Sequence, residues 1–326
     1  MRNFLLCLSI LLSSFSGFTQ EVRHISRSGT ADSSFYDMVK LSDGAIWLAG
    51  EYGILKRYDG DNLVQIDYPN TGANILRIAE MGDYLFMAAD HGTIYRLHKP
   101  SNTWKVKQFE NYRNQCFYDM LSDADGKLWL CGGSSGIGKG KMRIPRGFVV
   151  RLDTSLNHEP NRVWSSFRHF AWTLTRDVED QVVFSVFNGL NSRLYRTNST
   201  GTLQKAEKIR GLVHSLSMLD GRLVYGGCVG LRYKQKGMWG YADGTQTRNI
   251  IRKAGFISNI IEHDRQLIAF SQQGQVWALK PDQHVLLWAG STGSLYEGLS
   301  ANGLLWLAGH GKTFLSLDKT SPAAEN

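Results

Sequence analysis

The sequence of 326 residues is poor in cysteine and contains no compact catalytic or metal-binding motif. Of its four cysteines, three lie beyond the first twenty residues: Cys116, Cys131 and Cys228. An odd number without metal-ligand spacing indicates neither a disulfide framework nor a zinc site, although a bridge between Cys116 and Cys131 on adjacent strands stays open. Because His-x-His, His-Glu-x-x-His and Cys-x-x-Cys spacings are missing, we expect no metal site and no cofactor. No Gly-x-Ser-x-Gly motif lies on a strand–turn–helix, so a serine hydrolase is not indicated.

Long apolar runs are also missing, except at the start of the chain. Residues 1–20, MRNFLLCLSILLSSFSGFTQ, combine one basic residue, an apolar core and a small-residue exit. This layout is typical of a secretory signal peptide, and the core from Phe4 to Leu12 is too short to span a bilayer. No later segment is long and apolar enough for a membrane helix. We therefore expect an exported mature chain, 21–326, that is periplasmic, cell-surface or secreted and has no membrane helix.

The charge balance is basic, with a formal net charge of +8 at pH 7. Removal of the expected signal peptide takes away Arg2 and no acidic residue, which leaves 8 − 1 = +7. A surface of this charge favours acidic partners such as anionic glycans. The charges are scattered along the chain, however, so ordinary solubility explains them equally well, and we do not expect a nucleic-acid partner.

Long helical periodicity does not occur, and a repeat of short strands takes its place. The segments FYDMVKLSDGAIWLAGEYG from Phe35 and FYDMLSDADGKLWLCGG from Phe117 share a first run, a turn, a second apolar run and glycine. Five further copies follow the same plan, with hairpin signals such as Asp-Gly and Asn-Gly between runs. The second runs of the seven copies have as anchors Trp47, Phe86, Trp129, Phe184, Val224, Ile268 and Trp306. The gaps between anchors are 39, 43, 55, 40, 44 and 38 residues.

A period near 40 residues with four short strands per unit is typical of a β-propeller. We predict an all-β fold, a seven-bladed β-propeller that forms a single domain over residues 21–326. The last copy supplies only three strands, and the segment EVRHIS at the start of the mature chain has no other partner. We therefore expect this N-terminal strand to close the last blade, because an open blade would leave a sheet edge unpaired.

The repeats also resemble those of a known family. The stretch DGAIWLAGEYGILKRYDG resembles the propeller repeat of two-component regulators, and it is similar to the repeats of photosystem II stability and assembly factors. The resemblance covers nearly the whole mature chain and implies a propeller fold. It transfers no ligand residue, because the shared positions are packing and turn residues of the blades.

Candidate functional residues fall on one face of the predicted propeller, which we call the top face. It is the side on which the chain enters each inner strand, and the loops between second and third strands return to it. Four of the nine histidines belong there: His91, His169, His214 and His310. With Arg168 and Tyr118 they fit a polysaccharide lyase, in which a cation neutralises the uronate carboxylate and a tyrosine or histidine removes the adjacent proton. The alternative is that they are single polar residues on separate blades.

The sequence therefore leaves two functions open. The preferred one is an exported non-catalytic binding or scaffold propeller that recognises a glycan or protein, either anionic or uncharged, on its top face. In that reading the ligand contacts are His91, His310 and the basic residues of the third unit described below. The alternative is a carbohydrate-active enzyme, a polysaccharide lyase of uronate-containing glycans, whose catalytic candidates are Arg168, His169, His214 and Tyr118.

Aspartates and tryptophans inside the repeats have structural explanations as well. Asp37 and Asp119 occupy matching places in two inner strands; they either line the channel or hydrogen-bond the backbone of a neighbouring blade, and we expect the second. The recurring Trp47, Trp129 and Trp306 are expected in the core between blades. Outside that register stand three more tryptophans, any of which is open to stacking on a sugar: Trp172, Trp239 and Trp288.

The stretch GGSSGIGKGKMRIPRG, residues 132–147, superficially matches a phosphate-binding loop. Gly140 follows the lysine where Ser or Thr is needed, and the strand-like GFVVRLD follows where a helix is needed. We therefore predict an expanded loop between the second and third strands of the third blade, on the top face. Its basic side chains either grip an anionic ligand or form a solvated hairpin: Lys139, Lys141, Arg143 and Arg146.

Overall fold

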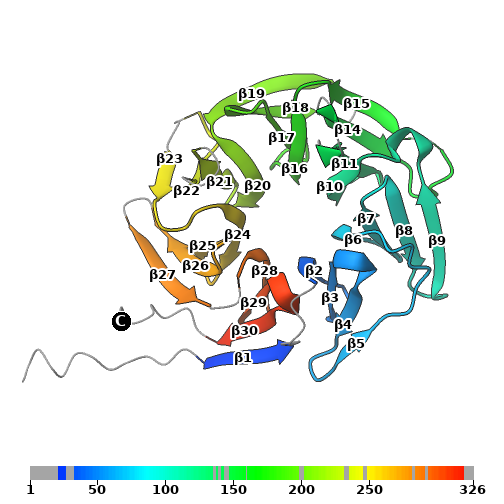
Figure 1. Ribbon diagram of the computed structural model, residues 1–326, viewed down its shortest axis with the longest axis horizontal. Helices are drawn as coiled ribbons and strands as arrows, with labels where there is room; N and C mark the ends of the chain where they lie inside the picture. Colours follow the sequence, from blue (N-terminus) through cyan, green and yellow to red (C-terminus); the bar gives the residue numbers. More distant parts are fainter. Residues whose placement is uncertain are drawn as a thin grey trace, which may run out of the picture.

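The computed structural model describes residues 21–26, 33–134, 137–138, 141–142, 147–158, 160–197, 202–230, 235–244, 248–280, 283–290 and 293–318. In these residues, seven antiparallel sheets of four strands stand around a common axis as the blades of a propeller (Figure 1). In the first six blades the strands follow one another in chain order from the axis outward. The predicted all-β fold with seven blades is confirmed.

The strands have the following bounds. Blades 1 to 3 consist of β2 (Phe35–Lys40), β3 (Ile46–Gly50), β4 (Leu55–Tyr58) and β5 (Leu63–Gln65); β6 (Ile75–Met81), β7 (Tyr84–Ala89), β8 (Thr93–His98) and β9 (Thr103–Gln108); β10 (Cys116–Ser122), β11 (Leu128–Gly133), β14 (Gly147–Leu152) and β15 (Asn161–Ser166). Blades 4 to 6 consist of β16 (Phe170–Arg176), β17 (Val182–Phe187), β18 (Asn191–Thr197) and β19 (Leu203–Arg210); β20 (Leu212–Leu219), β21 (Arg222–Val229), β22 (Lys236–Tyr241) and β23 (Arg248–Ile251); β24 (Ile257–His263), β25 (Gln266–Ser271), β26 (Gln275–Leu279) and β27 (His284–Ala289). Blade 7 consists of β28 (Leu295–Ala301), β29 (Leu304–Gly309), β30 (Phe314–Asp318) and β1 (Glu21–Ser26).

The seven predicted anchors all lie in the second strand of their blades. Trp47, Trp129 and Trp306 are at most 6% exposed, as expected for core residues. Of the tryptophans outside this register, Trp239 is fully buried in the core between blades 5 and 6, and Trp288 packs at the edge of the core between blades 6 and 7. The hydrophobic clusters lie between successive blades, so each interface depends on both neighbours.

Every inner strand begins with a local irregularity. Its pairing with the second strand shifts register near its start, for example between Phe35 and Asp37 in β2 and between Leu295 and Glu297 in β28. Such a β-bulge adds a residue to one strand and re-aims its side chain. All seven bulges lie at the top-face end of the inner strands, so the fold repeats the same device around the axis.

Strand β1 lies at the outer edge of blade 7 (Figure 1). It pairs antiparallel with β30, in a register that sets Glu21 opposite Asp318 and Ser26 opposite Phe314. The two ends of the described chain therefore share one sheet.

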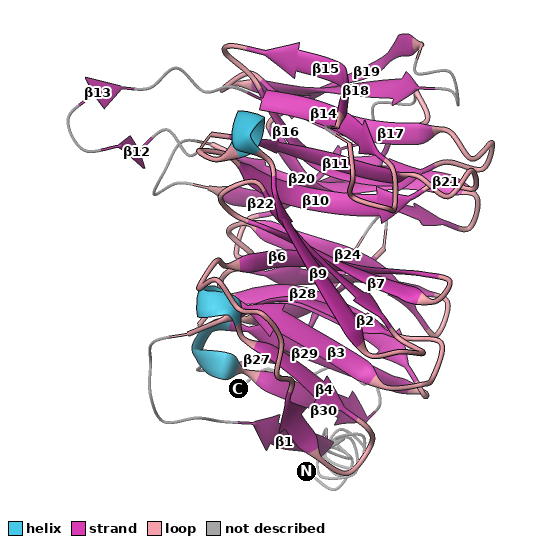
Figure 2. Ribbon diagram, turned by 90° about the vertical axis from the view of Figure 1, so that its right-hand side faces the viewer, coloured by secondary structure: helices cyan, strands magenta, loops and turns pink. Residues whose placement is uncertain are grey.

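The top face carries the longer connections of the fold. The short 3-10 helices η1 (Glu51–Gly53), η2 (Glu110–Tyr112) and η4 (His310–Lys312) lie on it, and so does a small hairpin of β12 (Ile137–Gly138) and β13 (Lys141–Met142) (Figure 2). This hairpin stands between β11 and β14, at the place predicted for the expanded loop. Among the described residues no helix is both long and apolar enough to cross a membrane.

The three described cysteines carry free thiols. Cys131 lies opposite Asp119 in the β10–β11 pair, whereas Cys116 lies opposite Gly133, so the bridge left open by the sequence is not formed. Burial raises the pKa of Cys116 and of Cys228 to about 11, which keeps both thiols protonated and unreactive near neutral pH.

Candidate functional site

The residues at the seven bulges form a layer at the top-face end of the axis, which we call the bulge ring. Its members, in blade order, are Tyr36, Leu76, Tyr118, Trp172, His214, Ser258 and Tyr296. Five of the seven carry aromatic or imidazole rings. Six of the seven are partly exposed, and Ser258 is buried.

Contacts between neighbouring blades join the bulge ring. Tyr118 stacks on Trp172 with centroids 4.7 Å apart, and Trp172 meets His214 at 5.2 Å. At the interface between the first and last blades, Tyr36 packs edge-on against Tyr296, with ring centroids 5.4 Å apart. Trp172, which the sequence left open as a sugar-stacking residue, thus belongs to this layer and is not part of the core between blades.

His214 is held in a neutral form. Its Nδ1 lies 3.0 Å from the carbonyl oxygen of Ser258, which can only accept, so Nδ1 donates and Nε2 is left as an acceptor. Burial lowers the pKa of His214 to about 3. The ring also packs edge-on against Phe256 at 4.7 Å. His214 is therefore an uncharged aromatic member of the ring near neutral pH.

The residues that follow the bulges form a second layer, which includes a cluster of four charged side chains. We call Asp37, Arg77, Asp119 and Glu297 the axial charge cluster. The Arg77 guanidinium lies 3.1 Å from Asp119, 3.4 Å from Glu297 and 3.6 Å from Asp37, and its side chain is 20% exposed. One cation from blade 2 thereby links blades 7, 1 and 3.

Ionisation in the axial charge cluster is set by burial and by mutual charge. Burial raises the pKa of Asp37 and of Glu297, and Arg77 offsets this only in part. Burial acts to lower the pKa of Arg77, but the three carboxylates outweigh it and hold that pKa above its usual value. The cluster therefore keeps its guanidinium charged and favours a proton on one of its carboxyl groups.

The two aspartates also bind the backbone of the next blade, as the sequence led us to expect. Asp37 Oδ2 accepts the amide of Ile78 at 2.5 Å. Asp119 Oδ2 accepts the amide of Leu174 at 2.7 Å and the hydroxyl of Thr173 at 2.9 Å. The roles of Arg77 and Glu297 were not predicted, because nothing near them in the sequence shows that they meet the aspartates of other blades. An alignment of the inner strands would have shown that all four charged residues occupy the same position.

The four predicted histidines are distributed over separate places. His91 is exposed, adopts a left-handed backbone with φ of 56°, and lies 3.9 Å from Asp90. His310 is also exposed, and its Nδ1 lies 3.2 Å from Ser34 Oγ. His169 stands in the loop before β16, where its Nδ1 lies 3.0 Å from Ser166 Oγ. Only His214 reaches the bulge ring.

The four lyase candidates do not converge. The Trp172 ring stands between Tyr118 and His214. Arg168 is exposed, and its backbone amide donates to Ser166 Oγ at 3.3 Å. Burial raises the pKa of the Tyr118 phenol, which works against the phenolate that a base would need.

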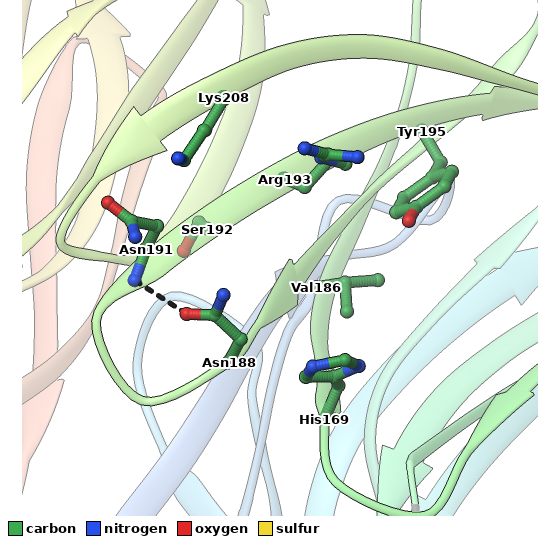
Figure 3. A pocket seen from close by; sticks show the side chains of 8 residues that line it. All are labelled: His169, Val186, Asn188, Asn191, Ser192, Arg193, Tyr195 and Lys208. Carbon is green, nitrogen blue, oxygen red and sulfur yellow. Dashed lines mark hydrogen bonds between the residues drawn. The ribbon is translucent and has the colours of Figure 1, made fainter.

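Beside His169 lies a cavity of about 230 Å³ at the top-face end of blade 4, which we call the blade 4 pocket (Figure 3). Side chains from β17, β18, β19 and the adjoining loops surround it. They are His169, Val186, Asn188, Asn191, Ser192, Arg193, Tyr195 and Lys208. The sequence pointed to His169 alone among them.

Gly147, which follows the basic stretch of the third unit, lies against the backbone of His169. A Cβ at Gly147 would lie 2.2 Å from the carbonyl oxygen of His169, so the chain passes there without room for a side chain. Of the predicted basic contacts, Lys139, Arg143 and Arg146 lie outside the described residues. Lys141 is part of β13, and its side chain lies outside the description.

Comparisons with solved structures support the fold. Virginiamycin B lyase from Staphylococcus aureus, solved in an inactive form with quinupristin, superposes with a TM-score of 0.67 at 11% identity, over 92% of this chain and 99% of that one. YCF48 bound to D1 peptide gives 0.66 at 10% identity, over 92% and 97%. The extracellular domain of a hybrid two-component system from B. thetaiotaomicron gives 0.62 at 17% identity, over 92% of this chain and 40% of that one.

The chain thus spans well under half of the two-component structure that it resembles. No protein-family model matches the chain, and no curated protein sequence matches it. At these identities the comparisons establish a propeller fold whose structural neighbours include a two-component system domain and YCF48, and they assign no activity.

Proposed function

We propose that this protein is a non-catalytic binding propeller that holds a glycan or protein ligand on its top face. The observation that supports this best is the bulge ring, in which partly accessible aromatic rings from several blades face the same end of the axis. Aromatic side chains of this kind offer large rigid contact area and stack on apolar faces of sugars or side chains. A binding surface needs only such a shaped, preorganised face.

The loops around the ring support the same face. Three of the most exposed large apolar side chains among the described residues lie in top-face loops: Tyr52 at 67%, Phe167 at 67% and Leu190 at 70%. Tyr52 is also held in a left-handed conformation, with φ of 55°, which strains a residue that has a side chain. Exposed apolar side chains in these loops are available to a binding partner.

Two neighbours in fold were solved with a bound molecule. YCF48 was solved with D1 peptide, and virginiamycin B lyase was solved with quinupristin. A propeller that acts as a lyase of anionic glycans remains the second candidate. It has less support here, because Arg168, His169, Tyr118 and His214 do not share a cleft.

The test is a binding screen with a paired variant. The mature chain is screened against acidic and neutral polysaccharides and a peptide array, and each ligand found is titrated calorimetrically with Trp172→Ala. The control is Tyr84→Ala, which removes an aromatic ring from the opposite end of blade 2. We expect Trp172→Ala to weaken binding at least tenfold and Tyr84→Ala to leave it unchanged. Binding that is insensitive to Trp172→Ala overturns the top-face proposal, and new ultraviolet absorbance from unsaturated uronates favours the lyase.

We also propose that residues 1–20 are removed on export, that residues 21–326 form one domain, and that β1 closes the ring. Support for closure is the register of β1 against β30, which pairs the otherwise open edge of blade 7. Deletion of residues 21–26 should lower the unfolding midpoint and promote self-association. Amino-terminal sequencing of the exported protein tests the cleavage. A deletion variant that is as stable and monomeric as the parent chain contradicts the closing role.

A further inference from the structure

The blade 4 pocket has a lining suited to an anion. Arg193 on β18 and Lys208 on β19 supply two cationic groups, and His169 supplies an imidazole. None of the described residues that line the pocket is acidic, and neither Arg193 nor Lys208 forms an ion pair within the described part of the chain. The positive charge there is thus not neutralised by the surrounding described side chains.

The two cations are placed against each other in the sheet. Arg193 and Lys208 are direct partners across the antiparallel β18–β19 pair. Like charges directly opposite each other destabilise a sheet, and a register shift directly follows this pair, between Arg193 and Tyr195. Bulges are frequent beside binding sites. An unfavourable charge pair at such a place is accounted for if a bound anion lies between or beside the two cations.

The remaining groups around the pocket include polar side chains whose positions are fixed by other contacts. Asn188 Oδ1 accepts the backbone amides of Leu190 at 3.1 Å and Asn191 at 2.8 Å, which leaves its amide nitrogen as a donor. Asn191 stands next to Asn188 at the rim of the pocket (Figure 3). Tyr195 is fixed by stacking on Phe184, with centroids 5.4 Å apart and planes at 13°. Its position is therefore set before any ligand arrives.

We propose that the blade 4 pocket binds a carboxylated sugar residue of an acidic glycan. Arg193 and Lys208 hold the carboxylate, His169 and the two asparagines bond to sugar hydroxyls, and Tyr195 bounds the ring. Carboxamides suit hydroxyl groups because they both donate and accept, and a cation–carboxylate hydrogen bond is among the stronger polar contacts. The exposed Leu190 and Phe167 beside the pocket offer apolar contacts to neighbouring sugars. This inference rests on the proposed binding function and names the ligand class of that face.

The test uses the mature chain with four probes: a short oligogalacturonate, its neutral methyl ester, polyglutamate and inorganic sulfate. The variants are Arg193→Gln and Lys208→Gln. Lys253→Gln is the matched control, because Lys253 is an exposed lysine in the top-face connection from β23 to β24. We expect the parent chain to prefer the oligogalacturonate over its ester, and each pocket variant to weaken that binding about tenfold. Lys253→Gln should change it less than twofold.

Stability provides an independent readout. Because Lys208→Gln relieves the opposition of like charges, its unfolding midpoint without ligand should equal or exceed that of the parent chain. The stabilisation added by oligogalacturonate should fall in the same variant. A variant that folds well yet loses binding separates the proposed role from a general loss of structure.

Several results overturn the inference. Unchanged oligogalacturonate binding in both pocket variants removes the carboxylate site, and so does an absence of oligogalacturonate binding by the parent chain. Preference for polyglutamate assigns the pocket to acidic peptides, and equal binding of sulfate alone reduces it to an unspecific anion site. In each case a ligand whose binding is lost in Trp172→Ala leaves the broader binding function standing.

Discussion

Replacement of Arg77 by methionine is the sharpest test of how the ring is held together at its axis. The guanidinium serves three carboxylates at 3.1–3.6 Å, from three different blades. Removal of one partner of a buried ion pair costs about 3–5 kcal/mol, because the remaining charge is left without compensation. The three contacts share one cation and are not additive. We therefore expect Arg77→Met to lose about 3–5 kcal/mol at pH 8, a large share of the stability of a typical domain.

The loss should depend on pH in a defined direction. Burial already raises the pKa of Asp37 and Glu297, and removal of Arg77 raises both further. A carboxyl group whose pKa is raised on folding binds more protons when folded than when unfolded. Stability contributed by these groups therefore increases as the pH falls from the raised pKa towards the ordinary carboxyl value. The free energy of unfolding lost in Arg77→Met should consequently be larger at pH 8 than at pH 5.

Denaturant unfolding at the two pH values, followed by tryptophan fluorescence, measures both effects. The matched control is Arg176→Met, because Arg176 pairs with Asp180 at 2.9 Å at the surface, where the side chains are 44% and 46% exposed. An exposed pair of this kind contributes about 0–1 kcal/mol. Arg77→Lys should fall between, since lysine keeps the charge but not the planar fork. The reasoning fails if Arg77→Met loses no more than Arg176→Met, or if its deficit is the same at both pH values.

Three further outcomes are expected. Gly298→Ala should lower the free energy of unfolding by about 1–3 kcal/mol, because its Cβ would lie 2.1 Å from the fully buried Phe270 ring. Denaturant unfolding measures this loss, and the double variant with Phe270→Leu should recover part of it. His214→Gln should reduce the loss of stability that the parent chain shows below pH 6.5. In the folded chain His214 stays neutral because its pKa is lowered to about 3, whereas the unfolded chain takes up the proton, which lowers the free energy of unfolding by about 2 kcal/mol at pH 5. Thermal unfolding between pH 7 and 5 measures this slope. Thr173→Val should cost about 1 kcal/mol by taking one hydroxyl donor from Asp119, and unfolding midpoints that match the parent chain would contradict that role.

The number and position of the blades were readable from the sequence because they depend on a local, repeated pattern. Each second strand needs a large apolar residue after a tight turn. Every copy of the repeat supplies one at the same place, such as Trp47, Trp129 or Trp306. Trp239 shows the limit of the argument. It stands outside the register and is nevertheless fully buried, because the third strand also faces the next blade.

The axial contacts were less accessible to sequence reasoning because they join residues far apart in the chain. Arg77 and Glu297 are separated by 220 positions, and each by itself resembles a surface charge on a strand. Asp37 and Asp119 were recognised only because their FYDM segments are identical. The blade 4 pocket was harder still, since its cations become neighbours only through the register of β18 and β19.

The distribution of charge assigns different tasks to the axis and to the outer part of the top face. The carboxylates at the axis already hold Arg77 and the backbone amides of Ile78 and Leu174. Groups with their hydrogen-bonding capacity used in this way contribute to the rigidity of the ring, and they have little left to offer a ligand. Arg193 and Lys208, in contrast, face each other across a sheet without an acidic residue among the described lining. An anionic ligand would therefore gain more from blade 4 than from the axis, while the partly exposed, uncharged rings of Tyr118 and Trp172 offer contact area to the part of that ligand that reaches the centre.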